Sequence, residues 1–410
     1  MRPARPPLGA GFGRLFTANL SSSLGDGIAR TALPLLGARL TDDPLLIAGI
    51  AALSLLPWLL FAIPAGIVVD RIDRRAALAL AQGVRVAVGL LLVGLTATGT
   101  LTIWWLYLVV FVYGAFETLY DGAVRAVVPS LVERADLPRA NSRIEAGELV
   151  VQNFLAGPVT SFLFAAVVLV PLGANVVVFA VAGILALLLP RAASGREHPR
   201  HREDEVAWFR QFADGYRFLR GSPMLFKLWL VSTVHGLFSA FAIASLVLFV
   251  LGPLGVPEAL YGTFMLCGAV GAVVGSLAAA RLASRWGSGP VMAAALVLGS
   301  LAVTAMGIMP IVPVALVGFA VSSGSILVWN VLIISLRQSL VPHRLLGRVH
   351  GTWRTLMWGA MPLGSIVGGL MGRIDLALPL IVGGGASAVV ALLYYRFIRS
   401  LPDPRDLPAV

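Results

Sequence analysis

Long apolar stretches separated by short polar ones run through the chain. A helix needs about 20 mostly apolar residues to cross a hydrocarbon core of about 30 Å. Twelve stretches meet this requirement, so the pattern predicts twelve membrane-spanning helices. They cover residues 13–38, 45–69, 76–97, 101–123, 144–170, 172–190, 224–251, 260–283, 289–309, 311–336, 349–372 and 376–397.

A long polar segment, residues 191–222, divides the twelve spans into two sets of six. We therefore expect an N-terminal bundle over residues 1–190, a linker over 191–222, and a C-terminal bundle with a short tail over 223–410. Within the linker, apolar and aromatic residues recur near helical spacing among arginines, which predicts a short amphipathic helix on the inner membrane surface. These residues are Trp208, Phe209, Phe212, Tyr216 and Leu219.

The placement of arginine gives the expected orientation of the spans, because arginine-rich connections mark the cytoplasmic side of a membrane. Every second connection is rich in arginine, whereas the alternate ones hold almost none beyond Arg39 and Arg373. We therefore expect a multi-pass protein of the cell (inner) membrane with the linker and both termini in the cytoplasm. The clusters are Arg71, Arg74 and Arg75, then Arg134, Arg139 and Arg143, then Arg281 and Arg285, then Arg337, Arg344 and Arg348, and finally Arg396, Arg399 and Arg405.

Composition excludes several other classes of protein. Of the 410 residues, 58% are hydrophobic and 12% are charged, whereas a soluble domain carries about 25% charged residues. The net charge of +11 does not indicate nucleic-acid binding, because the arginines stand in short clusters between apolar runs. The one cysteine, Cys267, excludes an internal disulfide and a cysteine-based metal cluster. The basic, proline-rich start lacks the features of a signal peptide and is expected to be a cytoplasmic tail.

The two sets of six spans echo each other in sequence. After the fourth span, Arg125 is followed four residues later by Pro129. After the tenth span, Arg337 is followed five residues later by Pro342, and the two prolines are 213 residues apart. The loops after the second and eighth spans begin at Gly66 and Gly275, which are 209 residues apart. Similar separations at two places indicate duplicated six-helix halves, which enclose a mid-membrane cavity and expose it alternately to each side.

Residues 66–75 have the sequence Gly-Ile-Val-Val-Asp-Arg-Ile-Asp-Arg-Arg. Placed after a second span, this segment resembles the signature loop of the major facilitator superfamily. Residues 125–142 and 341–349 resemble the branch that contains macrolide and multidrug efflux pumps and the enterobactin exporter. The resemblance covers essentially the whole chain, and it implies an all-α integral membrane fold of two pseudo-symmetric six-helix bundles.

This resemblance implies roles for two groups of residues. Gly157 and Pro158 are similar to the glycine-proline element of antiporters, although Ser161 and Phe162 replace the paired glycines of that pattern. The signature loop of the superfamily forms a cytoplasmic latch, whose ion pairs close in one state and break in the other. The resemblance implies that Arg74 meets Asp121 and that Asp70 lies near Arg348. The latch residues are then Gly66, Asp70, Arg71, Arg74, Arg75, Asp121, Arg125 and Arg348.

Ionisable residues deep in the first and fourth spans are candidates for proton coupling, because a charge at the bilayer centre costs about 3 kcal/mol or more. Asp26 and Arg30 are four residues apart and share a helical face. They form either a structural ion pair or a pair in which Asp26 titrates. Glu117 has no partner within its own span, and we favour it as the protonatable residue over a structural role.

His235 and Arg354 are expected to line the cavity, with a hydrogen-bonded structural histidine as the alternative for His235. The sequence holds neither GxxxxGKS nor GxxxxGKT, so the chain cannot hydrolyse ATP through a Walker loop. Its five histidines are scattered, so we expect no metal site and no cofactor. No catalytic residue is predicted. The energy source is then an ion gradient, worth about 2.3 kcal/mol per charge per 100 mV.

The leading hypothesis is a secondary transporter, not an enzyme, that exports a drug, a macrolide or a siderophore-like molecule in exchange for protons. An uncoupled facilitator or lipid-moving permease is the second hypothesis, which transport in uncoupler-treated vesicles would favour. A membrane scaffold or sensor without transport is the third, and the intact signature loop argues against it. The expected partners are substrate, protons and lipid, without nucleic acid and with one chain as the working unit.

Overall fold

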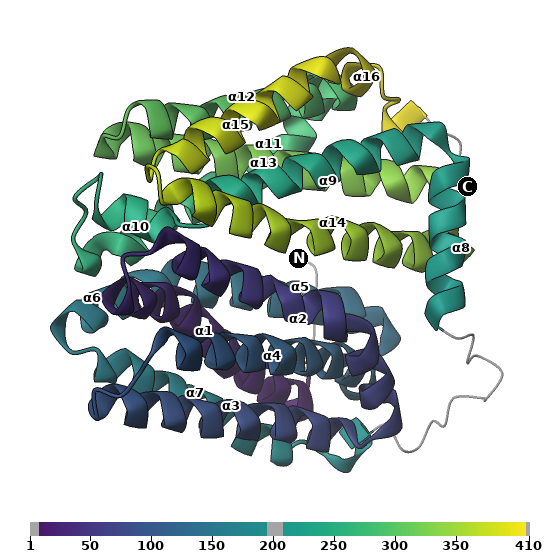
Figure 1. Ribbon diagram of the computed structural model, residues 1–410. Coiled ribbons are helices and arrows are strands. Elements are labelled where there is room, and N and C mark those ends of the chain that lie inside the picture. Colours follow the sequence, from purple (N-terminus) through teal and green to yellow (C-terminus); the bar gives the residue numbers. More distant parts are fainter. Residues whose placement is uncertain (1–7, 195–207, 407–410) are drawn as a thin grey trace, which may run out of the picture. The chain divides into compact units, whose positions relative to one another are not determined.

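The computed structural model describes residues 8–194 and 208–406, except for the side chains of residues 62–64, 66, 67, 70, 71, 192, 208–211, 343, 344 and 406. These two ranges contain helices and no β-strand (Figure 1). The chain divides into two compact units. Unit 1 consists of Met1–Leu40, Leu56–Asp204 and Glu258–Gly262, and unit 2 of Thr41–Leu55, Glu205–Pro257 and Thr263–Val410.

Unit 1 is a bundle in which α1 packs on α7, and α3 packs on both α4 and α7. Close approach depends on small residues, since a Cβ on Gly25 of α1 would overlap the ring of Phe179 in α7. Its helices are α1 (Ala10–Leu40), the later part of α2 (Pro44–Arg71), α3 (Arg74–Ala97), α4 (Ile103–Leu131), α5 (Leu137–Leu149), α6 (Gly157–Ala166) and α7 (Leu169–Leu187), with short turns η1 (Arg134–Asp136) and η3 (Arg191–Ser194).

The fifth predicted span is a helix interrupted by a wider turn. A π-helical segment, η2 (Val150–Ala156), joins α5 to α6. Pro158 explains its position, because proline has no N–H to donate and its ring clashes with the carbonyl of the preceding turn. A π turn accommodates such a clash and is common at functional sites. This segment also packs tightly on α1, since a Cβ on Gly27 would lie 2.5 Å from that of Ala156.

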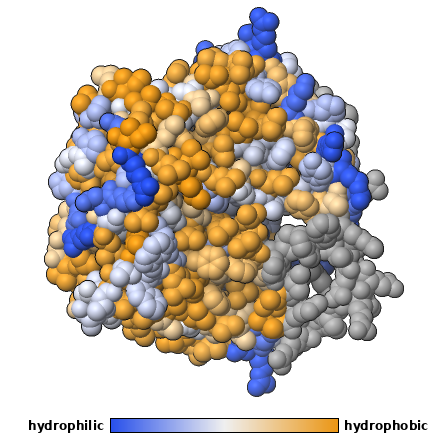
Figure 2. Space-filling view, in the orientation of Figure 1, coloured by the Kyte–Doolittle hydropathy of each residue, from blue (hydrophilic) through white to orange (hydrophobic). Residues whose placement is uncertain are grey.

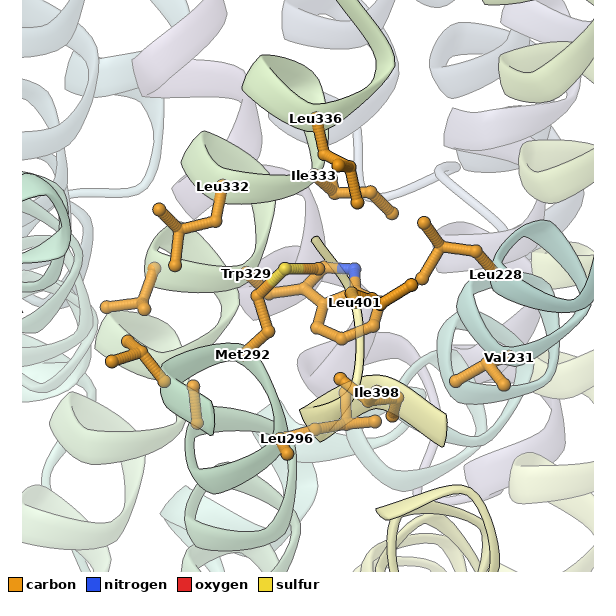
Figure 3. Packing of buried hydrophobic residues seen from close by; sticks show 14 of the residues in the cluster. Leu228, Val231, Met292, Leu296, Trp329, Leu332, Ile333, Leu336, Ile398 and Leu401 are labelled. Atoms are coloured by element: carbon orange, nitrogen blue, oxygen red, sulfur yellow. The ribbon is translucent and has the colours of Figure 1, made fainter. Parts of the chain in front are cut away.

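Unit 2 is a second bundle, in which α12 packs on α13 and α15, and α14 packs on α9. Its apolar core gathers around Met292, Leu296 and Trp329, with Leu332 and Ile398 beside them (Figure 3). Its helices are α8 (Trp208–Gly221), α9 (Pro223–Ile243), α10 (Leu246–Leu251), α11 (Glu258–Trp286, apart from Glu258–Gly262), α12 (Ser288–Ile308), α13 (Val312–Leu340), α14 (His343–Gly372), α15 (Leu378–Leu393) and α16 (Tyr395–Arg399), followed by η5 (Pro404–Asp406).

The exposed surface is apolar, as a lipid-facing surface must be. Leu277 and Leu393 are 76% and 75% exposed, and Figure 2 shows apolar side chains over much of the visible face. Among the described residues, ten segments are long and apolar enough to span a membrane. Two of the twelve predicted spans fall outside that count, because α1 carries several charges and α15 has 16 residues. The predicted all-α integral membrane fold is confirmed.

The helix α8 occupies the stretch for which we expect an amphipathic helix. It lies across the ends of α9 and α14, its neighbours in unit 2 (Figure 1). Leu219 is fully buried in the core of this unit. A Cβ on Gly215 would overlap Thr352 of α14, and the Thr352 hydroxyl donates a hydrogen bond to the carbonyl of Phe212 at 3.1 Å. Part of the apolar face of α8 therefore packs on protein.

Candidate functional site

Asp26 of α1 is paired with Arg85 of α3, not with the predicted Arg30. The Arg85 Nη2 atom donates to the Asp26 Oδ1 atom at 2.7 Å, and Arg85 is fully buried. Its guanidinium lies over the ring of Phe179 at 4.7 Å and also donates to the hydroxyl of Ser22. Sequence analysis missed Arg85, although a lone arginine within an apolar span is itself a signal of a buried partner.

Arg30 pairs with Glu117 of α4, at 3.1 Å between Nη2 and Oε1. The Arg30 side chain is 58% exposed and that of Glu117 is 18% exposed. This pair therefore differs from the buried pair of Asp26 and Arg85, because both of its side chains keep some exposure. Glu117, which has no partner within its own helix, finds one on a neighbouring helix.

Further acids surround this pair in unit 1. Asp121 is half-buried one turn along α4, where the negative charges of Glu117, Asp26 and Glu148 all act on it. Glu148 of α5 accepts a hydrogen bond from the amide of Asn19 at 2.7 Å. Carboxylates thus outnumber arginines within this cluster.

The structure places Arg74 and Arg75 of the signature loop on backbone carbonyls of neighbouring helices in unit 1. The Arg74 Nη1 atom donates to the carbonyl of Ala126 in α4 at 2.9 Å, and the Arg75 Nη2 atom donates to that of Leu187, the last residue of α7, at 2.6 Å. The Leu187 carbonyl, at the end of α7, lacks a partner within its own helix. Arg125 is exposed. The side chains of Gly66, Asp70 and Arg71 lie outside the described residues, so their latch role stays a prediction.

His235 of α9 lies inside unit 2. Its Nδ1 atom is 2.9 Å from the hydroxyl of Ser387, and its Nε2 atom is 3.5 Å from that of Ser239. The cavity beside it measures about 30 Å³, whereas small-molecule sites measure about 300–1,000 Å³. This cavity has room for water but not for a drug-sized substrate, which favours the structural interpretation of His235.

Arg354 and Arg348, both in α14, have different partners. The Arg354 guanidinium lies 4.8 Å from the centre of the Trp358 ring. Arg348 pairs with Asp214 of α8 at 3.0 Å, and Asp214 also pairs with Arg217 at 2.9 Å. Sequence analysis missed Asp214, because nothing in the spacing of α8 indicates where that helix docks.

The antiporter-like element belongs to a tight helix crossing in unit 1. A Cβ on Gly262, near the start of α11, would overlap the carbonyl of Gly157. Ser161, which replaces a glycine of the antiporter pattern, accepts a hydrogen bond from the Gly262 N–H at 3.0 Å and donates to the carbonyl of Ala259 at 3.1 Å. The departure from the family pattern therefore adds hydrogen bonds between helices. Pro158 lies beside Gly157 in the first turn of α6.

An ion pair accompanies this crossing. The Arg39 guanidinium, at the end of α1, donates twice to Glu258 at 3.0 and 2.5 Å. It also lies 4.7 Å from the centre of the Phe164 ring in α6.

A corresponding crossing in unit 2 joins α14 to the start of α2. Cβ atoms on Gly369 and Gly372 would lie 2.6 and 2.7 Å from the Cβ atoms of Ala48 and Pro44. Arg373, after α14, donates twice to Asp43, the residue before α2. The hydrogen bond from Arg373 lowers the pKa of Asp43, and the same bond raises the pKa of Arg373. The pair therefore stays ionised across the physiological pH range.

Comparisons with known proteins agree with this architecture. Residues 5–406 match the family of transmembrane secretion effectors. The enterobactin exporter EntS of Citrobacter koseri is 24% identical and aligns with 97% of this chain and 94% of its own length. The protein of the same name from Salmonella typhi is 26% identical and aligns with 84% of this chain and 82% of its own.

Solved transporters share the fold. A mutant of the nucleoside transporter NupG superposes with a TM-score of 0.79 at 13% identity, covering 95% of this chain and 99% of the other. A bacterial homologue of the iron transporter ferroportin, in an inward-facing state, gives 0.75 at 18% identity, covering 95% and 98%. Such low identities show the fold alone. Because the family match extends over nearly the whole sequence, this multi-pass membrane protein is an exporter and not an enzyme, and it belongs to the transmembrane secretion effectors of the major facilitator superfamily.

Proposed function

We propose that the protein exports a small amphipathic, siderophore-like molecule from the cytoplasm in exchange for protons, by alternating access. The ion pair of Arg30 and Glu117 carries the proposal. Its arginine is 58% exposed, although both residues belong to helices of a membrane bundle. The Glu117 side chain keeps 18% exposure, so its carboxylate can gain or lose a proton, whereas the buried Asp26–Arg85 pair cannot do so without leaving a buried charge.

Protonation of Glu117 changes the partner of Arg30. With Glu117 neutral, the charges left to act on Arg30 are those of Asp26 and Asp121. Asp26 is already held by Arg85, so Arg30 loses its main partner. The attraction between Arg30 on α1 and Glu117 on α4 is then lost, at a modest cost because Arg30 is partly exposed. Proton binding therefore biases the position of α1 against α4, and this bias couples the proton to the conformational cycle.

Two ion pairs beside glycine crossings support alternating access. Arg39 pairs with Glu258, and Asp43 with Arg373. In the topology expected from the arginine clusters, all four residues lie away from the cytoplasm. We infer that these crossings form the gate on that side, which opens when the cavity faces outward.

The substrate class rests on relatives. The proteins named enterobactin exporters align with most of this chain, which supports a siderophore-like substrate over an ion or a nucleoside. The small cavity at His235 cannot hold such a molecule.

Everted membrane vesicles test the proposal, with enterobactin and a lipophilic cationic dye as probes. We expect proton-driven uptake with the native chain, and loss of that uptake in Glu117→Gln with binding of the probe retained. Glu145→Gln is the matched control, because Glu145 is an exposed acid on α5. Full proton-dependent uptake in Glu117→Gln would overturn the coupling role. Uptake that an uncoupler leaves unchanged would support an uncoupled facilitator instead.

A further inference from the structure

Arg337, in the last turn of α13, is a buried cation with no acidic partner in the described part of the chain. Arg337 is 6% exposed, and its Nε atom has no hydrogen-bond partner. Its guanidinium carbon lies 4.7 Å from the centre of the Trp353 ring. The other deeply buried arginine, Arg85, differs because Asp26 neutralises it. A buried charge normally requires a counter-charge.

The groups around Arg337 do not supply a full counter-charge for its guanidinium. The C-terminal end of α13 and the Trp353 ring both favour a cation. Neither accepts the hydrogen of the Nε atom. No Asp or Glu whose side chain the structure describes is paired with Arg337. The missing counter-charge must come from elsewhere.

A cavity of about 280 Å³ lies beside this side chain, lined by Arg337, Gln338 and His350 with apolar residues such as Leu346 and Val349. Leu346 and Gly347 belong to the first turns of α14, whose start has no side-chain cap. The N–H groups of a helix start are donors without partners and favour an anion. His350 lines the same cavity and can offer a ring N–H from its neutral form.

We propose that this cavity binds a compact oxyanion, a phosphate or carboxylate group, through Arg337. The guanidinium fork matches such a group with paired hydrogen bonds. Gln338 donates alongside it, and the apolar wall packs on the carbon next to the anion. The volume is below the usual range for a drug-sized ligand, so the site takes a head group and not a whole exported substrate. An anionic phospholipid and a soluble phosphate are the two sources of this chemistry.

Ligand binding to the purified full chain tests the site without any transport measurement. In a neutral detergent, we expect inorganic phosphate or phosphatidylglycerol to raise the unfolding temperature in a saturable way, whereas phosphatidylcholine does not. A saturable response to phosphate identifies a soluble anion, and a response to phosphatidylglycerol alone identifies a lipid. Absence of any response to both anions would overturn the proposal.

Variants localise the response. Arg337→Gln should weaken the apparent affinity at least tenfold, while Arg285→Gln, which removes an exposed arginine that also lies over a tryptophan ring, should leave it unchanged. Equal binding by Arg337→Gln would overturn the assignment.

Gly347 provides a second variant that keeps Arg337 in place. A Cβ on Gly347 meets no atom within 4 Å, so Gly347→Glu can supply a carboxylate from within the cavity. We expect it to raise the unfolding temperature without ligand and to abolish the response to anions, while the neutral Gly347→Gln does neither. If Gly347→Glu binds anions as tightly as the native chain does, the proposal fails.

Discussion

Asp43 and Arg373 form a two-pronged ion pair, with N–O distances of 2.8 and 2.6 Å, that ties the residue before α2 to the residue after α14. The pair lies beside the crossing in which Gly369 contacts Ala48. Both side chains keep some exposure, 26% and 49%. Packing therefore brings these helix ends together. The exposed ion pair adds only modestly to the stability of the crossing and can break easily.

Loss of this pair should loosen the crossing without unfolding the protein. Ala48 is fully buried, so Ala48→Cys in a Cys267→Ser background reports opening through alkylation by a membrane-impermeant maleimide. The pair is exposed and contributes little, so Asp43→Asn should speed alkylation by about 1.4- to 5-fold.

Asp42→Asn is the control for this measurement, since Asp42 is an exposed neighbour. Exchange of the two charges, Asp43→Arg with Arg373→Asp, should restore slow alkylation. If Asp43→Asn and Asp42→Asn have the same effect, the pair is not part of a gate.

The same pair should not sense protons in the physiological range. The hydrogen bond from Arg373 lowers the pKa of Asp43, and an unfolded aspartate has a pKa of about 3.9. The contribution of Asp43 to stability is therefore fully present above that value and is lost as the pH falls through the lower folded pKa. The difference in unfolding temperature between the native chain and Asp43→Asn should stay constant from about pH 8 to 5. A difference that changes within this range would make Asp43 a proton sensor.

Removal of the Asp26 carboxylate should lower the free energy of unfolding more than removal of the Glu117 carboxylate does. Asp26→Asn leaves the fully buried Arg85 without its partner, a loss that costs about 3–5 kcal/mol. Glu117→Gln removes the partner of Arg30, which is 58% exposed. We therefore expect the free energy of unfolding to fall by at most about 1 kcal/mol. Unfolding in detergent measures both variants. Greater destabilisation by Glu117→Gln would contradict the assignment of Asp26 as structural.

The helix α8 should depend on its glycine to dock on α14. Gly215→Leu places a side chain where Thr352 and the Arg348 carbonyl already lie, so α8 should separate from α14. Leu219→Cys, at a buried position, should then become open to alkylation. Gly221→Leu is the control, because a Cβ there meets no atom within 4 Å. Equal protection of the cysteine in both variants would show that α8 docks by other contacts.

The spans were predictable because each depends on a local property, the apolar length of a stretch. The same property explains the two exceptions to the membrane-segment count, since charges interrupt α1 and α15 is short. The break in the fifth span at Pro158 was not predicted, although a proline within a span is its sequence signal. The Asp26–Arg30 pair was expected because four-residue spacing is the only pairing that a single helix reveals.

The partners that the structure gives to the charged residues come from other helices. Arg85 stands 59 positions from Asp26, and Glu117 stands 87 from Arg30. Helix packing sets such pairs, and periodicity along the chain does not encode them. The same reason explains why Asp214 and Glu258 were not proposed as partners of Arg348 and Arg39. Sequence analysis therefore identified Arg30 and Glu117 as candidate functional residues, but it did not predict that they form an ion pair with each other.

Proton release on substrate binding tests the central claim most directly. If Glu117 exchanges its proton for substrate, addition of enterobactin to the purified protein in weakly buffered detergent at neutral pH should release protons in proportion to the substrate bound. Glu117→Gln should bind enterobactin and release none, while Glu145→Gln should behave as the native chain does. Equal proton release from Glu117→Gln and the native protein would contradict the exchange of proton and substrate at the Arg30–Glu117 pair.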